Sequence, residues 1–186
     1  MSRKLIIYDD FFNEYGLSAI NDISKELFNS ISPNVYAKNG YPLIDQTMQQ
    51  LFESLLGQPV FFYENSGVLV ETNVKNDSVH AWSSDWFAVL PLNKSYLEDE
   101  CLKLLTKNNQ SKYEFSKMEK NINKTYTCAQ IVTSNSVEDF EESITVPFKN
   151  NRLILIEGNL WHSVNFKDNG RAVIFFIGKG QNNAEN

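Results

Sequence analysis

The two histidines of this chain, His80 and His162, are the side chains best suited to chemistry. Each lies in or beside an apolar segment of β-strand type, VHAW around the first and LWHSV around the second. An imidazole nitrogen is a common ligand for a divalent transition metal. Arg171 follows His162 by nine positions, after the turn sequence DNG at 168–170, and a guanidinium can pair bidentately with a carboxylate. The pattern raises two questions: whether the histidines hold a metal, and whether Arg171 holds an acid beside it.

The carboxylate that would complete such a metal site is harder to place. A non-haem iron site uses two imidazoles and one carboxylate and leaves positions open for O2 and a bidentate co-substrate. On a strand, the first imidazole and the carboxylate are spaced His-X-Asp, because alternate residues share a face. Here Trp82 stands at that position; it is either a core aromatic or a wall of the pocket, and alternation from His80 favours the pocket. Asp85 is the nearest carboxylate, and a turn or bulge at 83–84 would have to bring it round.

Two amphipathic helices are expected before these residues. Apolar side chains recur with helical spacing from Asn13 to about Asn29, and again from Met48 to Leu56. Gly57 is placed to end the second helix in a left-handed conformation. Both helices should therefore pack one apolar stripe against the rest of the chain.

The rest of the chain has the pattern of short β-strands separated by turn residues. We expect strands at 5–8, 60–63, 68–72, 79–81, 86–90, 101–105, 126–132, 144–146, 152–156 and 171–177. Two helices followed by about nine strands indicate an α+β chain whose helices pack on a β-sandwich or barrel. We expect an exposed excursion at 107–124, an acidic loop at 134–142 and a frayed tail at 181–186.

Composition argues against nucleic-acid and membrane partners. A length of 186 residues fits a single domain spanning 1–186. The formal net charge of -6 disfavours a nucleic-acid partner, which would need a basic surface. No run approaches the ~18 apolar residues of a membrane span. Asp9 and Asp10 interrupt the N-terminal segment before an export signal could form, so a cytoplasmic protein with no membrane partner is expected.

Three segments carry a resemblance to a known family: VHAWSSDWFAVLPLN around His80, NNRLILIEGNLWHSV around His162 and GRAVIFF around Arg171. In this order, together with LIIYDDFF and LLGQPV nearer the N-terminus, they resemble the 2-oxoglutarate/Fe(II)-dependent oxygenase superfamily, in particular its small prolyl-hydroxylase-like members. The resemblance implies a double-stranded β-helix, a jelly-roll and cupin-like core, with two N-terminal helices packed on it. It further implies Fe(II) bound by His80 and His162, with Asp85 as the candidate third ligand, and 2-oxoglutarate bound by Arg171.

The sequence also departs from that family at Trp82, and the segment KSYLEDECLKLLTKNN lacks the glycines that commonly follow the first histidine strand. Three interpretations of the metal site stay open: Asp85 reaches it, the site has no protein carboxylate as in halogenating members, or the site is degenerate. The halogenating members replace the carboxylate by a small residue, whereas Trp fills space.

The resemblance implies hydroxylase-type oxidation of a C–H bond in a small molecule or peptide. The alternatives are a non-catalytic binding or scaffold protein on the same fold, and a cupin-like metal enzyme that uses no 2-oxoglutarate. The primary substrate and the oligomeric state are not determined by the sequence.

Overall fold

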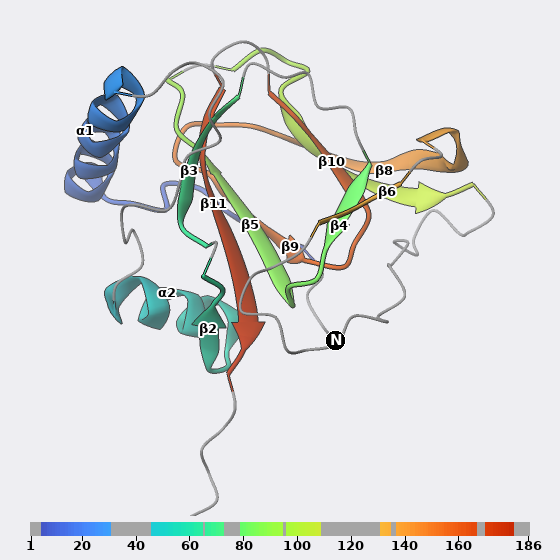
Figure 1. Ribbon diagram of the computed structural model, residues 1–186, viewed down its shortest axis with the longest axis horizontal. Coiled ribbons are helices and arrows are strands. Elements are labelled where there is room, and N and C mark those ends of the chain that lie inside the picture. Colours follow the sequence, from blue (N-terminus) through green and yellow to red (C-terminus); the bar gives the residue numbers. More distant parts are fainter. Residues whose placement is uncertain are drawn as a thin grey trace, which may run out of the picture.

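The computed structural model describes residues 5–30, 46–64, 66–72, 79–94, 96–108, 131–134, 137–166 and 170–180. Two antiparallel sheets form the body of the protein (Figure 1). The two helices lie on one side of the larger sheet, and the smaller sheet lies on its other side (Figure 1). This arrangement is an α+β jelly roll with N-terminal helices packed on it, as the sequence predicted.

Both expected helices are present. Helix α1 (Glu14–Ser30) begins after Asn13, whose side-chain oxygen accepts a hydrogen bond of 2.9 Å from the Gly16 N–H, as a helix N-cap does. Helix α2 (Gln46–Leu56) ends at Gly57, which has a φ of 65° and donates its N–H to the Glu53 carbonyl. Neither helix is long and apolar enough to cross a membrane.

The larger sheet has six strands, and the long strand β11 lies near its centre. Its order is β1-β9-β5-β11-β2, and β3 pairs with the first half of β11 while β2 pairs with its end. The strands are β1 (Leu5–Tyr8), β2 (Val60–Phe62), β3 (Val68–Thr72), β5 (Trp86–Pro91), β9 (Leu153–Glu157) and β11 (Gly170–Lys179).

The smaller sheet has five strands in the order β7-β4-β10-β6-β8. They are β4 (His80–Trp82), β6 (Cys101–Lys107), β7 (Ile131–Thr133), β8 (Phe140–Pro147) and β10 (His162–Asn165). A short 3-10 helix, η1 (Val137–Asp139), leads into β8. Strands β4 and β10, which carry the two histidines, are neighbours in the middle of this sheet.

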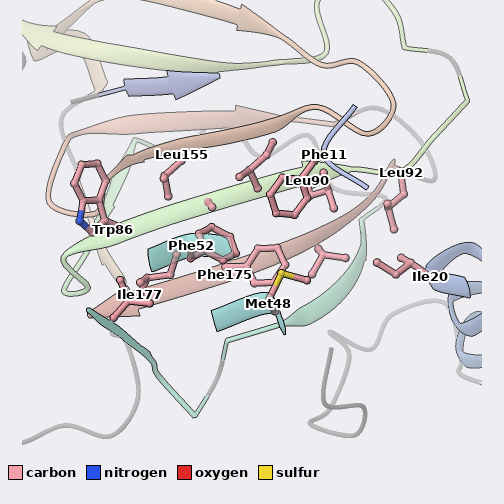
Figure 2. Close-up of a cluster of buried hydrophobic side chains, with 14 residues drawn as sticks. Phe11, Ile20, Met48, Phe52, Trp86, Leu90, Leu92, Leu155, Phe175 and Ile177 are labelled. Atoms are coloured by element: carbon pink, nitrogen blue, oxygen red, sulfur yellow. The ribbon is translucent and has the colours of Figure 1, made fainter. Parts of the chain in front are cut away.

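The two faces of the larger sheet bury different side chains, because successive residues of a strand point to opposite faces. One face packs against the helices in what we call the helix-side cluster (Figure 2), made of Phe11, Ile20, Met48, Phe52, Val60, Trp86, Ala88, Leu90, Leu92, Leu153, Leu155, Val173, Phe175 and Ile177. The other faces the smaller sheet in the inter-sheet cluster, made of Phe87, Val89, Leu102, Leu104, Val146, Phe148, Ile154, Ile156, Leu160, Phe166, Ala172 and Phe176.

The sequence missed one strand and misjudged the start of another. Strand β10 was not among the expected strands, since HSVN is short and three of its four residues are polar; its neighbours β4 and β6 hold it in the sheet. Strand β8 begins at Phe140, inside the predicted acidic loop, because its mostly exposed side chains at the edge of the sheet are polar. Most of the predicted excursion at 107–124, residues 126–130 of one predicted strand and the tail at 181–186 lie outside the described residues.

Candidate metal centre

His80 and His162 lie side by side in the smaller sheet. They are 82 positions apart in the chain, yet the antiparallel pairing of β4 with β10 places them directly opposite each other. Their ring centroids are 4.4 Å apart, with 62° between the ring planes. His162 is fully buried and His80 is 5% exposed. Two imidazoles at this separation in the interior could share one metal ion.

The hydrogen bonding of His162 leaves one ring nitrogen available. Its Nδ1 lies 2.8 Å from the Leu160 carbonyl oxygen, and since that oxygen can only accept, Nδ1 carries the proton and Nε2 carries a lone pair. Nε2 is buried and has no hydrogen-bond partner among the described residues. Metal-binding histidines are oriented in this way, with one N–H fixed by a carbonyl and the other nitrogen directed to the metal. The available nitrogen of His162 therefore fits a metal ligand.

The surroundings keep His162 neutral. Burial holds the pKa of its imidazole well below the ordinary value of 6.5, the neighbouring His80 lowers it further, and the Leu160 carbonyl acts in the opposite direction. A neutral imidazole is the form that coordinates a metal. His162 can therefore coordinate a metal at neutral pH without first losing a proton.

Aromatic side chains from both sheets pack against the imidazoles. The Phe87 ring stacks on His162, with centroids 5.0 Å apart and 24° between planes. Trp82 meets His80 edge-on at 6.0 Å, lies nearly parallel to Phe87 at 5.9 Å, and contacts Phe176 at 4.4 Å. Trp82 thus lies on the same side as the imidazoles, between the two sheets. Its indole Nε1–H is also buried without a hydrogen-bond partner in the described part of the chain.

The structure does not bring Asp85 into this group. The chain bends at 83–85, as an Asp85 ligand would require, and Gly158 holds the bend by accepting the Trp82 N–H and donating to the Asp85 carbonyl. However, the Asp85 carboxylate accepts the Lys179 N–H at 3.0 Å, at the end of β11. The described residues contain no group of three or more His, Cys, Asp or Glu that could hold a metal. The bend leads from β4 of the smaller sheet to β5 of the larger sheet, and Asp85 lies at its end, where its carboxylate binds to the larger sheet.

The Arg171 side chain leaves the backbone on the helix side of the larger sheet, the face away from the imidazoles. It is half-buried near the beginning of β11, where its N–H donates to the Asn93 side chain and its carbonyl accepts the Leu92 N–H. By alternation it shares the side of Val173 in the helix-side cluster, whereas Ala172 faces the inter-sheet cluster. An acid bound at the imidazoles would therefore meet the Arg171 guanidinium only if that side chain passed around the start of β11.

Sequence reasoning overlooked three residues that shape the site. Leu160 orients His162 through its carbonyl, Phe87 stacks on the same ring, and Gly158 holds the bend after Trp82. A backbone carbonyl and an apolar strand residue give no pattern by which a sequence could identify them. Gly158 did carry a signal, because the sequence Glu-Gly-Asn at 157–159 is typical of a turn and a glycine allows a close approach of two backbones.

No protein-family model matches the sequence, and no curated protein matches it either. Solved structures do resemble it. HygX from Streptomyces hygroscopicus, with nickel and 2-oxoglutarate bound, is 10% identical over 96% of this chain and 83% of its own, with a TM-score of 0.55. AviO1 from Streptomyces viridochromogenes is 11% identical over 96% and 90%, with a TM-score of 0.56. A prolyl 4-hydroxylase from Phytophthora capsici is 14% identical over 98% of this chain and 61% of its own, with a TM-score of 0.51.

At these identities the likeness concerns the fold. The fold of this protein is the double-stranded β-helix of the 2-oxoglutarate/Fe(II)-dependent oxygenases, with the two imidazoles on neighbouring strands of one sheet. The double-stranded β-helix predicted from the sequence is therefore confirmed as the fold of this chain.

Proposed function

We propose that this protein is a metal-dependent oxygenase of the 2-oxoglutarate type that binds Fe(II) through His80 and His162 alone. The observation that carries the proposal is the buried Nε2 of His162, which has a lone pair and no partner in the described residues and lies beside a second imidazole. A buried acceptor left unpaired costs about 1–3 kcal/mol, so its persistence calls for a ligand.

The two imidazoles fit a two-nitrogen site, and the part of the chain that the structure describes offers no third His, Cys, Asp or Glu ligand. With two protein ligands, more coordination positions stay open for oxygen ligands than in a site with a carboxylate. A 2-oxo acid could fill two of them and would bring negative charge to a centre that has none of its own. When bound, Fe(II) with 2-oxoglutarate would supply O2 activation and the oxidising equivalents for C–H oxidation of a small molecule or peptide.

The chain's own contribution would be orientation and the exclusion of water. The Leu160 carbonyl fixes the tautomer and the ring plane of His162. Phe87 and Phe176, with Trp82, line the inner side of the imidazole pair and keep it in an apolar environment. A low-dielectric surrounding strengthens the interaction between the metal and any anionic co-substrate.

The first experiment is an anaerobic Fe(II) titration of the wild type and His162→Ala, followed by 2-oxoglutarate. We expect one Fe(II) per wild-type chain and at least about a 100-fold weaker affinity in the variant, since losing even an outer-shell partner costs about 10–100-fold. Ser163→Ala is the matched control, because it changes the next residue of the same strand. Equal Fe(II) affinity in wild type and His162→Ala would contradict the proposal.

A second candidate is a non-catalytic binding protein on the same fold. It is favoured by Trp82, which packs against Phe87 and Phe176 at the position of the expected carboxylate. Succinate release from 2-oxoglutarate under O2 separates the two candidates. Fe(II) binding through His162 without any succinate, across a panel of small molecules and peptides, would support the second candidate.

A further inference from the structure

Two aromatic side chains, Phe61 and Tyr63, lie on the inter-sheet side of the larger sheet, in strand β2 and just after it. Val60 and Phe62 pack in or against the helix-side cluster, so alternation directs Phe61 and Tyr63 to the opposite side. Their ring centroids are 5.1 Å apart, with 48° between the planes. Phe61 is 45% exposed and Tyr63 is half-buried. The pair therefore offers aromatic surface to solvent.

The backbone of β11 positions the Phe61 ring. Phe61 is paired with Gly178 across the two strands, and an added Cβ at Gly178 would lie 2.1 Å from the nearest atom of that ring. The ring thus lies directly against the glycine, a close approach that a larger residue would prevent. Phe61 is therefore held by contact with β11, although almost half of its surface faces water.

The aromatic surface continues from Tyr63 towards the imidazole pair. The Tyr63 N–H donates to the Phe176 carbonyl at 3.1 Å, so these two residues are neighbours across the strands, and both pack with the inter-sheet cluster. The ring centroid of Phe176 lies 4.4 Å from that of Trp82, which in turn lies 6.0 Å from that of His80. Trp82 is itself only partly buried. A molecule bound at Phe61 would therefore extend along one aromatic surface towards the proposed metal centre.

Asp85 places a negative charge beside this surface. The bend between β4 and β5, where Asp85 lies, is at the same end of the molecule as β2 and the end of β11 (Figure 1). Burial raises the pKa of the Tyr63 hydroxyl, and the charge of the nearby Asp85 raises that pKa further. The Asp85 carboxylate accepts the Lys179 N–H at 3.0 Å, which fixes its position. The Lys179 side chain leaves β11 on the helix side, because it follows Gly178 by one position.

We infer that the substrate of the proposed oxygenase carries an organic ammonium group, which binds on Phe61 and Tyr63 beside the Asp85 carboxylate. The inference rests on the proposed function and names its class of substrate. A cation is attracted to the electron-rich face of an aromatic ring, and a carboxylate within reach adds a charge of the opposite sign. The carbon atoms of an organic ammonium group also cover apolar surface, and the net charge of -6 favours the approach of a cation.

The experiment measures choline binding to the metal-free protein at constant ionic strength, from the shifts of aromatic proton NMR signals. Choline is compared with the neutral alcohol in which carbon replaces its nitrogen, since the two share a shape and differ in charge. We expect choline to bind at least about fivefold more tightly, or ~1 kcal/mol, which is within the range of cation–π interactions. Equal affinities would overturn the inference, because they would show that apolar surface alone is recognised.

Three variants locate the site. Phe61→Leu removes the aromatic ring, and Asp85→Asn removes the charge but keeps an acceptor for the Lys179 N–H. Each should weaken choline binding about threefold to tenfold. Gly178→Ala should weaken it as well, because the added Cβ displaces the Phe61 ring. Tyr15→Leu is the matched control, since it removes a ring that is 88% exposed on α1, and choline affinity should stay within about twofold of the wild type. Unchanged affinity in both Phe61→Leu and Asp85→Asn would contradict the inference.

The outcomes separate this inference from the function on which it rests. Fe(II) binding through His162, together with equal affinities for choline and the neutral alcohol, would leave the metal site standing and overturn the inference. Choline selectivity without Fe(II) binding would overturn the proposed function, and with it the assignment of the cation as substrate. A dimer in sedimentation that Phe61→Leu dissociates would identify this surface as an interface between two copies of the chain, which also overturns the inference.

Turnover gives a further check once Fe(II) is bound. We expect ammonium compounds to stimulate succinate release from 2-oxoglutarate more than their neutral counterparts do. Phe61→Leu should raise the concentration needed for half-maximal release about threefold to tenfold, in parallel with its effect on choline binding. Stimulation that is equal for charged and neutral compounds would contradict the assigned class of substrate.

Discussion

The two faces of the larger sheet come from the same strands but serve different purposes. On the helix side, Phe52 of α2 lies 5.2 Å from Phe175 and 5.5 Å from Phe62 by ring centroids, in a cluster of apolar side chains (Figure 2). On the inter-sheet side, Phe87 stacks on an imidazole whose Nε2 is unpaired. One face gains stability by removing apolar surface from water, whereas the other includes polar atoms whose burial costs stability. Alternation along the strands of the larger sheet thus keeps the apolar helix-side cluster apart from the imidazoles.

Matched truncations on the two faces should give the largest effects. Phe52 and Phe87 are both essentially fully buried, so Phe52→Ala and Phe87→Ala should each lower the free energy of unfolding by about 3–5 kcal/mol. Only Phe87→Ala should also weaken Fe(II) binding, because Phe87 stacks on His162. Urea unfolding and anaerobic Fe(II) titration measure the two quantities. A loss of Fe(II) affinity in Phe52→Ala equal to that in Phe87→Ala would remove the distinction between the faces.

The importance of the bend at 83–85, which leads from the smaller sheet to the larger, can be tested by a substitution of Gly158. An added Cβ there would lie 2.3 Å from the Ser84 carbonyl oxygen and 2.6 Å from its hydroxyl, so the bend after Trp82 must move. We expect Gly158→Ala to lower the free energy of unfolding by about 1–3 kcal/mol, as overpacking does. It should also weaken Fe(II) binding, since the bend positions β4. Gly16→Ala is the control, because its Cβ meets side-chain atoms alone, those of Phe12 at 3.3 Å and of Asn13 at 3.5 Å. Unchanged stability in Gly158→Ala would contradict this prediction and show that the bend can shift to accept a Cβ.

The inter-sheet face should also give the metal-free protein a pH dependence. The pKa of His162 is lowered in the folded state, so below its ordinary value of 6.5 the unfolded chain binds a proton that the folded chain does not. Stability should therefore be complete above pH 6.5 and fall as the pH is lowered, by at most about 1.4 kcal/mol per pH unit. Urea unfolding between pH 5.5 and 7.5 measures this slope.

Two variants isolate the contribution of His162 to that slope. His162→Asn should flatten the pH dependence, while Phe52→Ala should lower the whole curve and leave its shape unchanged. An unchanged slope in His162→Asn would assign the pH dependence to another group.

The smallest effect is expected at Arg171. Because alternation places it on the helix side, Arg171→Ala should change 2-oxoglutarate affinity of the Fe(II)-loaded protein by only a few-fold. Arg152→Ala, which removes an exposed pair with Asp9, is the control for general loss of positive charge. A loss of more than about tenfold in Arg171→Ala alone, as expected for a lost charge-assisted bidentate pair, would show that the guanidinium does reach the imidazole side.

The elements with strong periodic patterns could be predicted from the sequence. The apolar spacing from Met48 and the glycine after Leu56 predicted α2 almost to the residue, since they report a local preference. The apolar segments of β5, β9 and β11 were likewise evident. Strand β10 was not, because its four residues form a strand only between β4 and β6. The importance of His162 could be predicted from its type and context, but its partner Leu160 could not.

The sequence by itself determined the fold class and the two histidines as the candidate ligands, because hydrophobic periodicity and residue chemistry are local properties. Only the tertiary structure decided which neighbours those histidines have. Asp85 and Arg171 lie near the imidazoles in the sequence pattern, yet a bend held by Gly158 and the alternation of β11 direct them elsewhere. The face of a sheet to which a side chain points depends on the turns and the strand register that precede it. A shift of the register by one residue turns the side chain to the opposite face. For that reason Trp82, which the sequence shows only as a missing carboxylate, becomes in the structure a buried hydrogen-bond donor beside the proposed metal centre.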